Sequence, residues 1–250
     1  MKLEVVASRW DTEAAKILTV AQGLGRCAPY SQHYTRTDET LANALCSPSS
    51  VDRQALQVQF NLSSYLPQMP IRVKHTAIRD VKLIEPSILS DKRGVSFVSF
   101  DQEEFEEHVA RGYQFVQERH SVSAHNVLSG LHYQIQRPQG KLVRVLNGEV
   151  VGVAVDLRRW SPTFGRWISA RLSASNCCQL WIPPGFAHGS LVLSDVAEIL
   201  YKTTERGFVE HERTLQWNDP DIAIAWELDK APITSARDAA GTSFSMAEVY

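Results

Sequence analysis

Five residues in the second half of the chain carry side chains suited to moving protons: His132, Lys141, His188, Tyr201 and Asp238. Imidazole titrates near pH 6.5, so it can act as a base at neutral pH, while a lysine supplies charge and a phenol can donate a proton. Each residue alone also fits an ordinary structural role, as a polar core residue or a solvated side chain. A functional interpretation therefore depends on the sequence around them.

The sequence gives little support for a hydrolase nucleophile, for a metal site or for a glycine-rich nucleotide-binding loop. The Gly-x-Ser-x-Gly elbow of hydrolases, the Walker A pattern and Gly-x-Gly-x-x-Gly are absent. The segment from Pro183 to His188 fits the Pro-x-Gly-x-x-His pattern of cupin barrels, but His132-Tyr133-Gln134 stands where a metal-binding cupin has His-x-His, and no Glu follows in register. Two imidazoles without a carboxylate make a poor zinc or iron site. We expect no metal and no cofactor.

Composition indicates an ordinary globular protein. The chain has 250 residues, of which 44% are apolar and 22% charged, with a net charge of −2 and therefore no basic surface for nucleic acid or membrane. It has neither an apolar run of about 18 residues, which a membrane span needs, nor a signal peptide, so we expect a cytoplasmic protein. Cys27, Cys46, Cys177 and Cys178 form no CxxC pair, and reduced thiols are expected.

The chain divides into two regions that differ in their predicted secondary structure. Residues 1–73 are mixed, with an amphipathic helix predicted over Asp11–Gly23 and a strand over Gln54–Phe60. We expect this N-terminal extension, whose role is unknown, to pack on the rest because so short a piece rarely has its own core. Residues 74–250 are predicted to form the main domain.

The main domain reads as mainly β. Asn147-Gly148 between two β-branched runs in Lys141–Leu157 predicts a hairpin with a type I′ turn. Asp101–Arg111 predicts one helix. Further strands are predicted over Tyr113–Arg119, Trp167–Leu172, Gln179–Ile182, Gly189–Leu193 and Glu198–Thr203. Many short antiparallel strands with one helix indicate a closed or sandwiched β-barrel.

A series of short motifs in a fixed order resembles the dTDP-4-dehydrorhamnose 3,5-epimerase family, over about two-thirds of the chain from Lys74 to Gly241. The motifs are Asp91-Lys92-Arg93-Gly94, Gly130-Leu131-His132-Tyr133-Gln134, Gln139-Gly140-Lys141-Leu142-Val143, Val153-Ala154-Val155-Asp156-Leu157-Arg158, Ser161-Pro162-Thr163-Phe164-Gly165, Trp181-Ile182-Pro183-Pro184-Gly185-Phe186-Ala187-His188-Gly189, Tyr201-Lys202-Thr203-Thr204, Trp217-Asn218-Asp219-Pro220 and Ser235-Ala236-Arg237-Asp238.

The resemblance implies a cupin-like jelly-roll barrel that works as a metal-free homodimer on a dTDP-linked 4-keto-6-deoxy sugar, inverting the carbons beside the ketone. It implies that His132 is the base, that Asp238 orients it, that Lys141 stabilises the enolate and that Tyr201 reprotonates from the opposite face. The segment carrying Arg93 would cross to the partner's nucleotide site.

The implied substrate-binding residues are only partly retained. Those that match ligand-contacting positions, or could replace them, are Arg93, Gln117, Arg119, His188, Glu212, Arg237 and Phe208. Ser129 stands where the family usually has an arginine that grips the diphosphate, and Arg119 replaces an asparagine. Val98, Gly152 and Ser190 replace the usual Glu, Asp and Phe. We expect Arg119 to compensate for Ser129, and Phe208 for a lost stacking ring.

Three functions remain open from the sequence. The first is a nucleotide-sugar epimerase acting on carbon 3, carbon 5 or both, because the proton-transfer residues are complete. The second is a repurposed isomerase or cyclase acting on another carbonyl compound, because binding residues have changed. The third is a non-catalytic cupin, which the joint presence of His132, Lys141, Tyr201 and Asp238 argues against.

Overall fold

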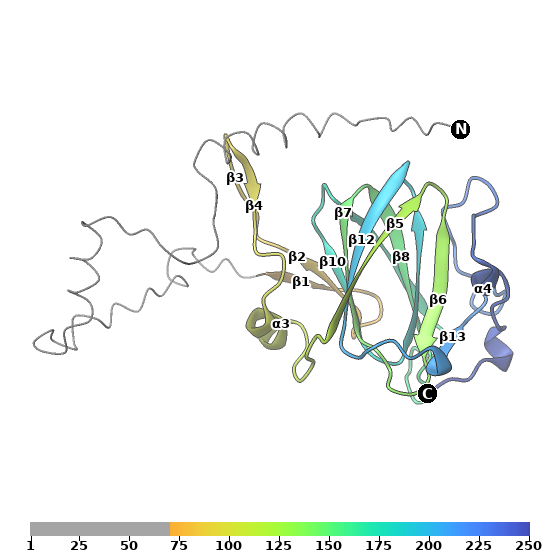
Figure 1. Ribbon diagram of the computed structural model, residues 1–250. Coiled ribbons are helices and arrows are strands. Elements are labelled where there is room, and N and C mark those ends of the chain that lie inside the picture. Colours follow the sequence, from red (N-terminus) through yellow and green to blue (C-terminus); the bar gives the residue numbers. More distant parts are fainter. Residues whose placement is uncertain (1–70) are drawn as a thin grey trace, which may run out of the picture. The chain divides into compact units, whose positions relative to one another are not determined.

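A computed structural model describes residues 71–250 (Figure 1). The helix predicted over Asp11–Gly23, the strand predicted over Gln54–Phe60, and Cys27 and Cys46 lie outside these residues. Cys177 and Cys178 are buried and unpaired. Among residues 71–250, no helix is long and apolar enough to cross a membrane.

Two antiparallel sheets face each other, which confirms the predicted sandwiched β-barrel. The first sheet has six strands, in the order β1 (Arg72–His75), β2 (Lys82–Glu85), β10 (Gln179–Ile182), β7 (Lys141–Asn147), β12 (Val196–Thr203) and β5 (Gln117–Ala124). The second has five, in the order β13 (Glu212–Thr214), β6 (Leu128–Gln134), β11 (Phe186–Val192), β8 (Glu149–Asp156) and β9 (Trp167–Ser173).

The remaining elements are short. The strands β3 (Leu89–Asp91) and β4 (Gly94–Ser96) form a separate hairpin, which stands away from the two sheets in Figure 1. The helices are α3 (Gln102–His108) and α4 (Ala236–Ala239), with the 3₁₀ turns η2 (Val209–His211) and η3 (Phe244–Met246). The helix α4 packs beside β6, next to the edge strand β13.

Alternating apolar side chains fill the space between the sheets. Val143, Leu180 and Ile199 of the first sheet pack with Val150 and Leu172 of the second, and all are nearly inaccessible. Burying a side chain of this size contributes about 1.5–3 kcal/mol. This apolar packing holds the two sheets at a fixed separation.

The two strongest local predictions are confirmed, although the helix ends at His108 rather than at the predicted Arg111. The hairpin of β7 and β8 turns at Asn147-Gly148, where Gly148 has φ +77°, a conformation that glycine adopts without steric cost. The helix α3 begins after Asp101, whose carboxylate accepts a hydrogen bond of 2.9 Å from the Glu104 N–H. Its one buried residue, Phe105, packs edge-on against Trp181 at 5.0 Å between ring centroids.

The strand predicted over Tyr113–Arg119 is wrong in its first half. β5 begins at Gln117 and continues to Ala124. Tyr113 and Phe115 instead pack against Trp181, with ring centroids 5.2 and 6.0 Å away. Burial of these rings outside the barrel overrides the local strand propensity.

The other predicted strands form with shifted ends. Trp167–Leu172 extends by one residue, Gln179–Ile182 forms as predicted, Gly189–Leu193 begins earlier at Phe186, and Glu198–Thr203 begins at Val196.

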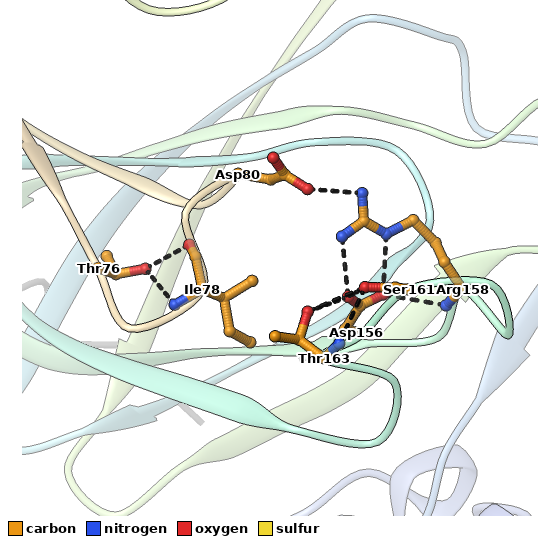
Figure 2. Close-up of polar contacts among 7 residues, drawn as sticks. All are labelled: Thr76, Ile78, Asp80, Asp156, Arg158, Ser161 and Thr163. Carbon is orange, nitrogen blue, oxygen red and sulfur yellow. Dashed lines mark hydrogen bonds and ion pairs between the residues drawn. The ribbon is translucent and has the colours of Figure 1, made fainter.

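A buried ion pair joins the end of β8 to two neighbouring turns (Figure 2). Asp156 is fully buried and accepts hydrogen bonds from Arg158 Nε (2.9 Å) and Nη2 (2.8 Å) and from the hydroxyls of Ser161 (2.6 Å) and Thr163 (2.7 Å). Arg158 Nη1 also donates to Asp80 at 2.8 Å, in the turn between β1 and β2. Burial raises the pKa of Asp156, but its combined hydrogen bonds outweigh this and hold the pKa below the ordinary value.

We expect Asp156→Asn to destabilise the fold by about 3–5 kcal/mol at pH 7, because it leaves the Arg158 guanidinium without its buried counter-charge. Because the folded-state pKa of Asp156 is lowered, its contribution is present above the unfolded carboxylate pKa and lost as the pH falls through the folded value. Urea unfolding of both proteins should therefore show a stability gap that narrows below about pH 4. Asp80→Asn, which alters the exposed carboxylate of the same network, should cost far less; an equal loss in both variants would contradict this account.

Candidate active site

A cavity of about 650 Å³ lies between the two sheets, and the predicted proton-transfer residues line it. Its walls come from β5, β6, β11 and β12, with β13 and the segment leading into α4 covering one side. The predicted residues that line it are Gln117, Arg119, His132, Lys141, His188, Tyr201, Glu212, Arg237 and Asp238. Residues more than one hundred positions apart in sequence are therefore brought to one site.

Two glycines allow β6 and β11 to approach closely enough to place His132 opposite His188. A Cβ on Gly130 would lie 2.6 Å from the His188 carbonyl oxygen, and one on Gly189 would lie 2.9 Å from the Ser129 carbonyl oxygen. Gly130 also has φ +109°, which side-chain-bearing residues rarely adopt. Both contacts are too short for any other residue, so these strands can pair this way only with glycine.

His132 is held by Asp238, as the resemblance implied. Its Nε2 lies 2.5 Å from Oδ1 of Asp238, a buried residue of α4. The backbone N–H of Asp238 donates to the Ser235 hydroxyl. A carboxylate only accepts hydrogen bonds, so Nε2 carries the proton and Nδ1 keeps its lone pair. Burial lowers the pKa of His132; the Asp238 charge opposes this, while Lys141 and Arg237 reinforce it. His132 is thus a neutral imidazole at pH 7.

Lys141 begins β7 and lies beside the histidine strand. Its Nζ donates to the His132 carbonyl oxygen at 3.3 Å. Burial lowers the pKa of this ammonium to about 8, helped by the charges of Arg119 and Arg237 and opposed by Glu212. Lys141 therefore remains mostly charged at neutral pH and loses its charge in mildly alkaline solution.

His188 and Tyr201 contact each other across the cavity, with ring centroids 5.8 Å apart. His188 is buried, and its Nε2 has no hydrogen-bond partner within residues 71–250. Burial and the charges of Lys141 and His132 hold the pKa of His188 well below 6.5, so it is neutral. Burial raises the pKa of Tyr201, which keeps its phenol protonated.

The cavity has an excess of unpaired positive charge. Glu212 pairs with Arg237, and Glu118 pairs with Lys202. Asp238 contacts the neutral His132 and keeps its negative charge, whereas two cations of the cavity, Lys141 and Arg119, lack an ion-pair partner within residues 71–250. Arg119 lines the cavity, and within residues 71–250 it forms no ion pair; its charge acts on Lys141 and Tyr201. A site of this kind favours an anionic ligand.

Two predicted binding residues lie outside the cavity of this chain. The Arg93 side chain is 84% exposed on the β3–β4 hairpin and pairs with Asp91. Phe208 packs under the guanidinium of Arg137, 4.3 Å from the ring centroid. Gln117 does line the cavity, and its Oε1 accepts a hydrogen bond of 3.2 Å from the Gly207 N–H.

The unusual substitutions divide into two groups. Ser129 and Ser190 are paired across β6 and β11 and both line the cavity, as does Arg119. Val98 is exposed and Gly152 faces the core, where a Cβ would meet Leu methyl groups at 3.6 Å. Only the first group can act directly on a ligand in this cavity.

Ser121 lines the cavity although it was not among the predicted site residues. On β5, the side chains of Gln117, Arg119, Ser121 and Ser123 all line the cavity because alternate residues of a strand share a face. The signal was available in this alternation, but the strand was predicted to end at Arg119. Within residues 71–250, no three or more His, Cys, Asp or Glu side chains cluster as metal ligands would.

Comparison with known proteins places the chain in a family. Residues 75–246 match the family model of dTDP-4-dehydrorhamnose 3,5-epimerase. The dTDP-4-dehydrorhamnose 3,5-epimerase of Pseudomonas aeruginosa is 53% identical over 180 residues, covering 72% of this chain and 99% of the relative. That of Salmonella typhimurium is 51% identical over 166 residues, covering 66% and 91%.

Solved structures agree. The dTDP-6-deoxy-D-glucose-3,5-epimerase of Legionella pneumophila, in complex with dTDP-4-keto-L-rhamnose, superimposes with a TM-score of 0.70 at 44% identity, covering 71% of this chain and 95% of that one. The Bacillus anthracis dTDP-4-dehydrorhamnose 3,5-epimerase, with TDP and pyrophosphate bound, gives 0.67 at 36% identity, covering 69% and 99%. The fold is thus the cupin-like jelly roll of these enzymes, and the chain belongs to the dTDP-4-dehydrorhamnose 3,5-epimerase family.

Proposed function

We propose that this protein is an isomerase that inverts carbon 3, carbon 5 or both of a dTDP-4-keto-6-deoxyhexose. The observation that carries this proposal is the placement of His132 and Tyr201 on facing sheets of one cavity, on β6 and β12. Inversion needs a base on one face of the carbon and an acid on the other. The named relatives favour this function over an isomerase or cyclase acting on another carbonyl compound.

The chemical role assigned to each residue follows from its protonation state. Neutral His132 removes the proton beside the ketone through Nδ1, while the Asp238 carboxylate stabilises the imidazolium that forms. The Lys141 ammonium stabilises the enolate oxygen, a contribution of about 3 kcal/mol for one such group. Tyr201, kept protonated by burial, returns a proton on the opposite face.

We assign substrate binding to the unpaired and charged groups of the cavity. Arg119 supplies the free guanidinium for the diphosphate, in place of the arginine that Ser129 replaces. His188, whose Nε2 has no hydrogen-bond partner among residues 71–250, contacts the sugar and nucleoside together with Gln117, Glu212 and Arg237. Phe208 can stack on the nucleotide base only if its ring moves away from the Arg137 guanidinium when the ligand binds.

We infer a homodimer in which the partner's hairpin completes the site. The β3–β4 hairpin exposes Leu89, Val95 and nearby Val98, and its Arg93 lies outside the cavity of its own chain. Exposed apolar side chains gathered on one arm favour a protein contact. Among the strands of residues 71–250, β5, which carries Gln117 and Arg119, lies at the edge of its sheet, so a second copy can dock on its outer side. The free thiols of Cys177 and Cys178 fit a reducing cytoplasm.

The function is tested by deuterium exchange. In deuterated water, the wild-type protein should introduce deuterium at carbon 3, carbon 5 or both of dTDP-4-keto-6-deoxyglucose, as read by proton NMR. His132→Ala should abolish exchange, and Asp238→Asn should lower kcat by about 10²–10⁴ because the imidazole loses its orienting partner. His120→Ala, on the outward face of β5, is the matched control. Exchange by His132→Ala at the wild-type rate would exclude His132 as the base.

We expect a bell-shaped pH dependence of kcat/KM. The rate should fall on the acidic side at a pH below 6.5, where His132 becomes protonated, and on the alkaline side near pH 8, where Lys141 loses its charge. Glu212→Gln should move the alkaline limb to lower pH because the Glu212 charge raises the Lys141 pKa. An alkaline limb near the ordinary lysine pKa of 10.5 would contradict the role given to Lys141.

Isothermal calorimetry with dTDP tests the binding residues. Arg119→Gln should weaken binding by about tenfold or more, because a charged hydrogen bond to the diphosphate is lost. Arg93→Ala should weaken it too if a second copy supplies this arginine. Arg166→Gln changes an exposed arginine outside the cavity and serves as control. Unchanged affinity in Arg119→Gln would place the diphosphate elsewhere.

A further inference from the structure

A helix of only four residues carries the carboxylate that contacts His132. Asp238 belongs to α4, and its Oδ1 lies 2.5 Å from His132 Nε2. A helix of about one turn makes too few internal hydrogen bonds to hold its own conformation. The direction of the Asp238 carboxylate therefore depends on contacts from outside the helix.

The chain before α4 is tied to the start of β6. The Ile233 N–H donates to the Asn126 carbonyl oxygen at 2.9 Å, and the Leu128 N–H donates to the Ile233 carbonyl oxygen at 2.9 Å. The side-chain amide of Asn126, a buried residue, donates to the Ala231 carbonyl oxygen at 2.8 Å. Because β6 also carries His132, these bonds fix the approach to α4 relative to the strand of the histidine.

The helix itself and the chain after it are tied to β13. The Thr242 N–H donates to the Thr214 carbonyl oxygen at 2.9 Å. Arg237 Nε donates to the Thr214 hydroxyl at 2.9 Å, and the Arg237 guanidinium also pairs with Glu212. Thr214 lies opposite His132 in the register of β13 with β6. Both ends of the segment are thus anchored beside the histidine, and the turn between them decides where Asp238 points.

The hydroxyl of Ser235 fixes this turn. Ser235 is the N-cap of α4, and its Oγ accepts a hydrogen bond of 3.1 Å from the Asp238 N–H. The first N–H groups of a helix have no acceptor inside the helix, so the capping side chain determines how this end is closed. Here the capped N–H belongs to Asp238 itself. The cap therefore restrains the same residue whose carboxylate contacts His132.

We propose that Ser235 is a positioning residue that holds the Asp238 carboxylate against His132. This inference rests on the proposed function. Without the hydroxyl, the Asp238 N–H loses its capping acceptor, and the carboxylate can turn away from the imidazole. His132 then loses the partner that orients it and stabilises the imidazolium formed when it takes the proton.

A displaced Asp238 has a signature in the pH dependence. The charged and titratable groups that act on His132 within residues 71–250 are Asp238 and Arg237 of α4, Lys141 of β7 and the neutral His188 of β11. Of these, Asp238 raises the pKa of His132, whereas the two cations and burial lower it. If the carboxylate moves away, the pKa of His132 falls further below 6.5. A merely weakened fold lowers the amount of active protein without moving this pKa.

The test compares the wild type with Ser235→Ala and Ser235→Thr on dTDP-4-keto-6-deoxyglucose, following epimer formation by proton NMR over a range of pH. In Ser235→Ala, kcat should fall about tenfold, because a slightly misplaced partner costs much of the rate. KM should change little, and the acidic limb of kcat/KM should move to lower pH. Ser235→Thr keeps the hydroxyl and should restore both kcat and the limb.

A double variant shows whether Ser235 acts through Asp238. In Asp238→Asn the carboxylate is already lost, so adding Ser235→Ala should lower kcat by less than about twofold more, because effects of residues that act as a unit are not additive.

Ser243→Ala is the matched control. Ser243 is the N-cap of η3, but its side chain makes no capping hydrogen bond, so this variant should keep the wild-type kcat and acidic limb. A wild-type kcat, an unmoved acidic limb or a raised KM in Ser235→Ala would overturn the inference while leaving the proposed function intact. So would an undiminished loss in the Asp238→Asn background. Wild-type protein that forms no epimer would overturn the proposed function and this inference together.

Discussion

Burial of ionisable side chains between two sheets is the constraint on which the chemistry of this site depends. The same loss of solvation acts in opposite directions on different groups, because it always disfavours the charged form. It lowers the pKa of His132, His188 and Lys141 and raises that of Tyr201. At neutral pH the cavity therefore holds a neutral imidazole and a protonated phenol, the states that the proposed base and the proposed acid require.

The free-energy cost of burying these ionisable groups is tolerated because they are gathered at the cavity. Elsewhere the interior of the barrel is apolar, or its buried charges are paired. The cavity residues of β5 are all polar, whereas the inward residues of β7 and β8, such as Val143 and Val150, belong to the apolar core. Outside the cavity, the buried charges of Asp156 and Arg158 satisfy each other (Figure 2). Paired charges there and apolar packing between the sheets let the cavity keep unpaired groups for a ligand.

Local sequence signals predicted the elements that are determined by residues close in sequence. Asn147-Gly148 specified a turn and Asp101 capped a helix, and both formed where expected. The start of β5 could not be predicted this way, because the rings of Tyr113 and Phe115 pack against the distant Trp181 instead of extending the strand. The approach of β6 to β11 likewise depends on the pairing of Gly130 with a strand about sixty residues later.

The candidate site was predicted less evenly than the fold. Family motifs identified His132 and Asp238, whose contact at 2.5 Å is a result of tertiary structure that no spacing in sequence could indicate. Ser121 was missed because its strand was ended too early.

The substitutions inside the cavity make physical sense as a set. If Ser129 replaces an arginine, as the resemblance implies, β6 has lost a charge, and Arg119 on β5 supplies one to the same cavity. A guanidinium at position 119 lies beside Tyr201 in the β5–β12 register, so its charge also favours the phenolate, which an asparagine would not do. Ser190, which the resemblance places where the family usually has a phenylalanine, lines the same cavity, and its hydroxyl lowers the pKa of Tyr201. The residues that depart from the family pattern thus keep positive charge and polar side chains in the cavity, which favours retained proton-transfer chemistry over a site rebuilt for an unrelated ligand.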